Sequence, residues 1–182
     1  MNIKRYIATI ILAIVLLLNF SCTDWLDVKP VDRMSEDQLY STEAGFRQAL
    51  NGIYVELNHA DLYGDELLVN TVEILAQRYK FSSMGTLTNQ YHLAEFDYTT
   101  DYAKKCGSRI WEKAYALIAN VNKLLKNADS HKDLFTGDSY DLITGEAYAL
   151  RAFLHFDLLR LFGPVYKTHK EDKSICYNTQ FS

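Results

Sequence analysis

The chain has 182 residues, of which 48% are hydrophobic and 13% aromatic, so it is long enough for one domain with a substantial core. Its two prolines and eight glycines argue against a low-complexity chain and against a β-sandwich with many turns. The formal net charge is −4 and no basic tract is present, which argues against a nucleic-acid-binding protein.

The first 21 residues have the pattern of a targeting segment. Two basic residues precede a nearly unbroken apolar run, residues 7–18, which is short for a membrane span. Ser21 then places a small residue directly before Cys22. The pattern predicts a lipoprotein signal peptide that is removed on export, with acyl chains such as palmitate on Cys22 holding the protein at a membrane. The alternatives are an ordinary secretory signal and an uncleaved anchor with a buried Cys22.

Two helices are predicted after an extended linker at residues 22–34. Ser35 and Gln38 form a capping box for a short helix. Thr42 caps a longer helix that ends near Asn58. The apolar residues of this longer helix recur at helical spacing: Phe46, Leu50, Ile53, Tyr54 and Leu57.

The middle of the chain is predicted to alternate between helices and one long loop. A helix is expected over residues 64–78, because leucine, valine and isoleucine supply one apolar side. Residues 79–99 show no helical period and are rich in Ser, Thr and Asn, so they are expected to form a loop. A long helix with a broad apolar face is expected over residues 101–127.

The closing helix, residues 145–164, is the part around which the rest is expected to pack. It carries one apolar stripe of Ile143, Ala147, Leu150, Leu154, Leu158 and Leu161, and a second of Tyr148, Ala149, Ala152, Phe156 and Leu159. One seam between the stripes holds Thr144, Arg151 and His155; the other holds Glu146, Asp157 and Arg160. Two stripes predict packed layers on both sides. Gly163 is expected in the left-handed conformation at the helix end, and Pro164 blocks continuation.

Catalytic signatures are absent from the sequence. The five histidines are scattered, and no GxSxG, P-loop or GxGxxG motif occurs. Glu66 and Glu73 could pair as in a glycosidase, but a solvated helix face explains them better. We therefore expect no enzyme, no cofactor and no metal. Whether Cys106 and Cys176 form a disulfide stays open.

Three stretches together carry a family resemblance. They are Ser21–Pro30, reading SCTDWLDVKP; the spaced residues Ile110, Trp111, Tyr115, Ile118, Asn120, Asn122 and Leu125; and residues 145–163, where GEA, LRA, FDL and LFG occur in order. In these stretches the chain resembles the N-terminal part of the SusD/RagB family of outer-membrane nutrient-binding lipoproteins. It departs from the family after Val165, where Tyr166 stands in place of the usual proline and the family's long remainder does not follow.

The resemblance implies an all-α helical array with tetratricopeptide-like packing, as a truncated SusD-like N-terminal region. Residues 1–21 would be the lipoprotein signal peptide, 22–34 an extended lipidated linker, and 35–182 an incomplete SusD-like helical domain. The protein would be lipid-anchored in the cell outer membrane and would face outward. It would bind oligosaccharides, or peptides, for import through a partner TonB-dependent transporter of the SusC-like type.

The long loop is where the resemblance places ligand contacts. Tyr79, Phe81 and Tyr91 supply flat rings for stacking on sugars, and Asn89 and Gln90 supply planar polar groups for hydroxyls. The alternative for each ring is that it closes the core beneath the loop, because aromatic side chains bury large areas. Two other functions stay open: a helical adaptor that binds a protein partner, and an inactive truncated fragment.

Overall fold

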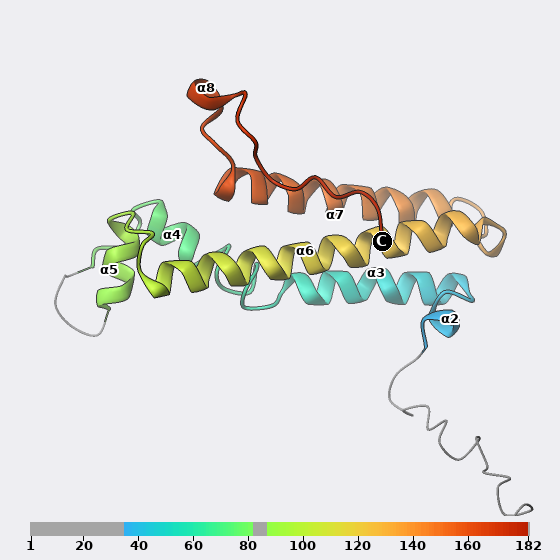
Figure 1. Ribbon diagram of the computed structural model, residues 1–182. Helices are drawn as coiled ribbons and strands as arrows, with labels where there is room; N and C mark the ends of the chain where they lie inside the picture. The colour runs from blue at the N-terminus through green and yellow to red at the C-terminus, as the bar shows by residue number, and fades with distance from the viewer. Residues whose placement is uncertain (1–34, 82–86, 182) are drawn as a thin grey trace, which may run out of the picture. The chain divides into compact units, whose positions relative to one another are not determined.

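A computed structural model describes residues 35–81 and 87–181 (Figure 1). Its helices are α2 (Glu36–Leu39), α3 (Glu43–Leu57), α4 (Thr71–Leu75), α5 (Thr88–Ala94), α6 (Asp101–Ser130), the 3-10 turn η2 (Lys132–Leu134), α7 (Ser139–Phe162) and α8 (Tyr166–His169). These two stretches contain no strand, so the all-α prediction is confirmed. Cys22, the signal segment 1–21 and the linker 22–34 lie outside the described residues.

Helices α3 and α6 each begin directly after a threonine cap, of which Thr42 was predicted from the sequence. The hydroxyl oxygen of Thr42 accepts a hydrogen bond from the Gly45 amide at 3.1 Å, and Thr100 does the same for the Ala103 amide at 3.3 Å. Each cap satisfies one of the amides that the first helical turn leaves without a partner. The predicted boundaries of both helices are therefore close to the observed ones.

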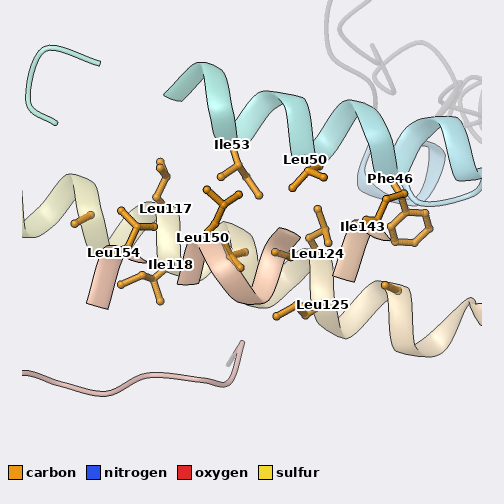
Figure 2. Packing of buried hydrophobic residues seen from close by; sticks show 14 of the residues in the cluster. Phe46, Leu50, Ile53, Leu117, Ile118, Leu124, Leu125, Ile143, Leu150 and Leu154 are labelled. Carbon is orange, nitrogen blue, oxygen red and sulfur yellow. The ribbon is translucent and has the colours of Figure 1, made fainter. Parts of the chain in front are cut away.

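The core lies where α3, α6 and α7 meet, and each of these helices contacts the other two. Figure 2 shows their apolar side chains pointing toward one another. The labelled residues are Phe46, Leu50 and Ile53 from α3; Leu117, Ile118, Leu124 and Leu125 from α6; and Ile143, Leu150 and Leu154 from α7. Helices α6 and α7 form an antiparallel pair joined by a short connection, as expected for tetratricopeptide-like packing (Figure 1).

Only one of the two apolar stripes on α7 is covered. The stripe that begins at Ile143 is buried against α3 and α6. The second stripe is exposed, with Phe156 at 57% accessible surface and both Tyr148 and Leu159 open to solvent. The prediction of packed layers on both sides is therefore wrong for the part of the chain that the structure describes. The physical reason is that α3 and α6 both pack on the same side of α7.

The helix predicted over residues 64–78 is reduced to the five residues of α4. Residues 58–70 instead form successive wide turns, in which the Glu66 amide donates to the Ala60 carbonyl. The Glu66 carbonyl in turn accepts from the Val72 amide at the start of α4. These turns carry the Glu66 side chain into the interior, where only 3% of the residue is exposed. The interpretation of Glu66 as part of a solvated face is therefore wrong.

Two further expectations are corrected at the loop and at the end of α7. The stretch predicted as a loop contains helix α5. Gly163 has φ of −76°, so it is not left-handed. Glycine fits there for a different reason: a Cβ atom would lie 2.4 Å from the Leu159 carbonyl oxygen.

Both described cysteines are free thiols, Cys106 buried and Cys176 exposed. Of the helices in the described ranges, none combines the length and the apolar character that a membrane crossing requires.

Candidate functional site

The predicted ligand residues lie on and beside a small unit made of α4 and α5. A second apolar cluster, separate from the main core, joins these two helices to the start of α6: Ile74, Leu93, Ala94 and Ala103. The Gln77 side-chain amide strengthens the link, because its Nε2 donates to the Ala94 carbonyl at 2.6 Å. The unit therefore provides a rigid support for the residues around it.

Tyr79 and Phe81 lie together at the end of this unit. Their rings meet edge to face with centroids 5.9 Å apart, and the Tyr79 hydroxyl donates to the Val69 carbonyl at 3.0 Å. Tyr79 is exposed, whereas Phe81 is half-buried against the second cluster. Phe81 therefore helps to close the core beneath the loop, as the alternative to a ligand contact predicted, while Tyr79 presents its ring to solvent.

Asn89, Gln90 and Tyr91 lie on α5, within its first turns. Asn89 is exposed, and Gln90 and Tyr91 are half-buried. The Tyr91 ring contacts His92 at 5.7 Å between centroids. Among the described residues, no ring contact joins Tyr91 to Tyr79 or Phe81. The structure thus brings Tyr79 and Phe81 together and places the other three residues on a neighbouring helix.

Two exposed aromatic residues that the sequence reasoning did not select are Phe96 and Tyr98, at 52% and 57% accessible surface. A turn at Asp97 separates them: its carboxylate accepts hydrogen bonds from the amide and the hydroxyl of Thr99. These bonds, chiefly the one from the hydroxyl, lower the pKa of Asp97. The signal that could have found the pair is an Asp followed by Thr two residues later, which is typical of a surface turn.

Backbone conformation at this unit is unusual at two places. Gln77 and Phe96 have φ of 59° and 58°, in the left-handed region that residues with a side chain rarely occupy. Each follows the end of a short helix, Gln77 after α4 and Phe96 after α5. Such conformations cost roughly 1–3 kcal/mol and are enriched at binding sites.

A cavity of about 380 Å³ opens beside Tyr98. Its walls come from α4, α5, α6 and the end of α7: Thr71, Leu75, Leu93, Ala103, Cys106, Gly107, Ile110, Leu161 and Phe162. Tyr98 and Lys104 also line it, and Lys104 is the only charged residue among its walls. The cavity suits an apolar group, and the exposed rings suit the flat face of a sugar.

The buried Glu66 carboxylate is held by structural partners. Thr71 donates its hydroxyl to Glu66, and the Arg109 guanidinium forms an ion pair with the other carboxylate oxygen. Arg109 also lies 3.6 Å from Asp61. A buried charge that is paired and hydrogen-bonded in this way is typical of a structural site. Within residues 35–81 and 87–181, no group of acids, histidines and cysteines has an arrangement that could hold a metal ion.

One protein-family model matches most of the chain. The SusD-like family model described as "Starch-binding associating with outer membrane" matches residues 24–180. The chain belongs to the SusD-like family. The resemblance read from the three sequence stretches is therefore confirmed, and the all-α structure agrees with it.

Two curated SusD-like relatives come from Formosa agariphila. SusD-like protein P2 is 27% identical over 162 residues, which cover 89% of this chain and 30% of the relative. SusD-like protein P25 is 27% identical over 148 residues, covering 79% of this chain and 28% of the relative. The chain thus spans under a third of the length of these relatives. No solved structure gives a significant match.

Proposed function

We propose that this chain is the N-terminal part of an outer-membrane lipoprotein that binds nutrient glycans, or peptides, for import through a partner TonB-dependent transporter. The observation that carries the proposal is the family match over residues 24–180. In this proposal residues 1–21 are the signal peptide, 22–34 the lipidated linker and 35–182 the SusD-like helical domain. The lipid on Cys22 tethers the protein to the outer face of the membrane.

The ligand surface proposed for this domain is centred on Tyr79, Asn89, Gln90 and Tyr91. Tyr79 offers an exposed ring and Asn89 an exposed amide. Phe81 is half-buried against the second cluster and supports this surface through its contact with Tyr79. Phe96 and Tyr98 extend it, because both rings are more than half exposed. Rings for stacking and amides for hydroxyl groups are the chemistry that a sugar requires.

Glycan binding is tested by titrating the full chain with starch oligosaccharides, other glycans and short peptides. We expect saturable binding to one class of ligand. Tyr79→Ala and Tyr91→Ala should each weaken it by about tenfold, which corresponds to the loss of one ring contact. Tyr166→Ala, which removes an exposed ring on α8, is the matched control and should bind normally. Equal binding by all three variants would place the ligand elsewhere.

The lipid anchor is tested by fractionation of cells that express the chain. Cys22→Ala should move the protein from the membrane to the soluble fraction, because the acyl chains are its attachment in this proposal. Cys176→Ala, at an exposed thiol, is the control and should stay with the membrane. Full retention of the Cys22 variant in the membrane would contradict lipidation at this residue.

The adaptor alternative is favoured by one observation, the exposed second stripe of α7 with Tyr148, Phe156 and Leu159. Exposed apolar surface of this kind marks protein interaction sites. An adaptor would form a stable complex with the transporter that added glycan does not change, and it would bind no glycan alone. An inactive fragment would instead bind an apolar dye and melt without cooperativity.

A further inference from the structure

A second candidate site lies between α6 and α7, away from the α4–α5 unit. An extended segment, residues 175–181, runs back along these helices after α8 (Figure 1). We call this segment the strap. Four polar side chains bind it: Tyr115 and Asn122 from α6, and Arg151 and His155 from α7. We call these four residues the main-chain clamp.

Asn122 and Arg151 form the centre of the clamp. Arg151 donates from one guanidinium nitrogen to the Asn122 side-chain oxygen at 2.9 Å and to the Thr179 carbonyl at 3.2 Å. Because its oxygen is engaged in this way, Asn122 turns its Nδ2 toward the strap. That nitrogen donates to the carbonyls of Asn178 and Gln180, at 3.2 and 3.4 Å.

His155 and Tyr115 bind the other half of the strap. The Asn178 amide donates to His155 Nε2 at 3.3 Å, while His155 Nδ1 lies 2.8 Å from the Arg151 carbonyl. The ring therefore carries its hydrogen on Nδ1 and accepts through Nε2. The Tyr115 hydroxyl donates to the Cys176 carbonyl at 2.7 Å.

All five of these bonds from clamp to strap end on main-chain atoms of the strap. The clamp therefore recognises an extended backbone rather than particular side chains, as in other sites that bind extended peptides. Side chains add only loose selectivity. Ile175 packs against the main core, the Tyr177 ring lies over His155, and the Phe181 ring lies near Lys123 and Lys126.

The clamp groups are covered while an occupant is bound. With the strap in place Asn122 and His155 are only 2% and 5% exposed, and Tyr115 and Arg151 are half-buried, so the main-chain atoms of the strap supply hydrogen bonds that these covered groups need. The strap, by contrast, is connected to the core through a weakly held stretch. Helix α8 contains no buried residue, and residues 166–174 are all exposed. Such a stretch can detach locally while the helices stay folded.

We propose that the groove between α6 and α7 is a binding site for an extended polypeptide segment, and that a segment supplied by another molecule takes the place of the strap. The ligand is a strand-like peptide that offers its main-chain carbonyls and one amide to the clamp. An aliphatic residue at its start and an aromatic residue six positions later match Ile175 and Phe181. This site is independent of the glycan surface proposed above.

The test uses a synthetic peptide of residues 174–181, with serine at the position of Cys176 and both ends blocked. In the intact chain the strap competes at an effective concentration on the order of millimolar. Asn178→Pro in the full chain removes the amide that His155 accepts and so weakens the strap. We expect this unlatched chain to bind the labelled peptide saturably, and the wild-type chain to bind it at least about tenfold more weakly.

Three controls make the test specific. A peptide N-methylated at the residue matching Asn178 should bind the unlatched chain about tenfold more weakly, since it lacks the same donor. Adding Tyr115→Phe to the unlatched chain should weaken binding about threefold to tenfold. Lys173→Pro places a proline outside the clamp and should behave as wild type. Equal affinity of wild-type and unlatched chains, or of both peptides, would overturn the proposal, as would no binding.

Hydrogen exchange on the wild-type chain gives a second test that needs no variant. The Asn178 amide should exchange through a local opening that leaves the buried amides of α6 and α7 protected. Exchange of that amide only with global unfolding would overturn the proposal. A concentration-dependent dimer of the wild type that disappears in Asn178→Pro would support it and identify a second copy of the chain as the source of the segment.

Discussion

The hydroxyl of Tyr63 donates a hydrogen bond of 2.8 Å to the carboxylate of Asp157, a residue 94 positions later in the chain. Burial, together with the Asp157 carboxylate, raises the pKa of Tyr63 well above its usual range, so the phenol remains a donor at any ordinary pH. The Tyr63 ring also stacks on Phe153, with centroids 5.1 Å apart. One residue thus fastens the irregular turns after α3 to helix α7.

Replacing Tyr63 by phenylalanine should remove this bond and keep the stacking. We expect the free energy of unfolding to fall by about 1.5–3 kcal/mol, the range for a hydrogen bond to a charged group. Urea denaturation measures the change. Tyr166→Phe, at an exposed position of α8, is the control and should leave the free energy unchanged. A Tyr63 variant as stable as the control would mean that the bond contributes nothing.

Leu124 tests the core between α3, α6 and α7. Its side chain is fully buried, so Leu124→Ala should lower the free energy of unfolding by about 2–5 kcal/mol through lost burial and a new cavity. Leu142→Ala makes the same chemical change at an exposed position of α7 and should cost less than about 0.5 kcal/mol. Thermal and urea unfolding of the pair would show equal losses if the observed packing were wrong.

Two glycines of α3 should respond to alanine with opposite signs. A Cβ on Gly45 would lie 1.7 Å from the Leu39 carbonyl oxygen, so the backbone of the α2–α3 turn would have to move. Gly45→Ala should therefore lower the free energy of unfolding by about 1–3 kcal/mol. A Cβ on Gly52 meets nothing within 4 Å, so Gly52→Ala should stabilise by about 0.5–1 kcal/mol. Melting temperatures that shift in the same direction for both variants would contradict this account.

Glu43 should make the free energy of unfolding fall at acidic pH. Hydrogen bonds from Arg47, then from Ser139 and Thr136, lower the pKa of Glu43 from 4.5 to about 2. A carboxyl group whose pKa is lower in the folded than in the unfolded protein stabilises the folded state fully at a pH above its unfolded-state pKa. For Glu43 this contribution is lost as the pH falls from about 4.5 toward 2. The Glu43→Gln variant should lack this part of the acid sensitivity. Glu95→Gln, at an exposed carboxylate, serves as the control in the same pH series.

The helical framework could be predicted from the sequence because local signals determine it. Thr42 predicts the start of α3, and apolar spacing predicts the buried faces of α6 and α7. The two polar seams of α7 were also identified. The structure gives each a partner: Arg151 and His155 face the strap, while Glu146 and Asp157 accept hydrogen bonds from Tyr54 and Tyr63.

The errors arise where distant residues override local pattern. The apolar side of residues 64–78 suggested a helix, but Glu66 pairs with Arg109, 43 positions away, and the chain turns to bring it inside. Similarly, nothing near Phe96 in the sequence reveals its positive φ. Of the site residues chosen from sequence, the placement of Asn89, Gln90 and Tyr91 depends on α5, which lacks a side-chain cap and was predicted as loop.

The way in which Asn122, Arg151 and His155 hold the strap has an evolutionary consequence. Because each bond that these residues make to the strap involves a backbone atom of the strap, most side chains of residues 176–180 can change without loss of a bond to the groove. Proline at position 178 is the exception, since that amide must donate. Among homologues, the strap should therefore vary rapidly in sequence while Asn122, Arg151 and His155 stay constant. The groove would then be identified in a homologue by these three residues and not by the sequence of the strap.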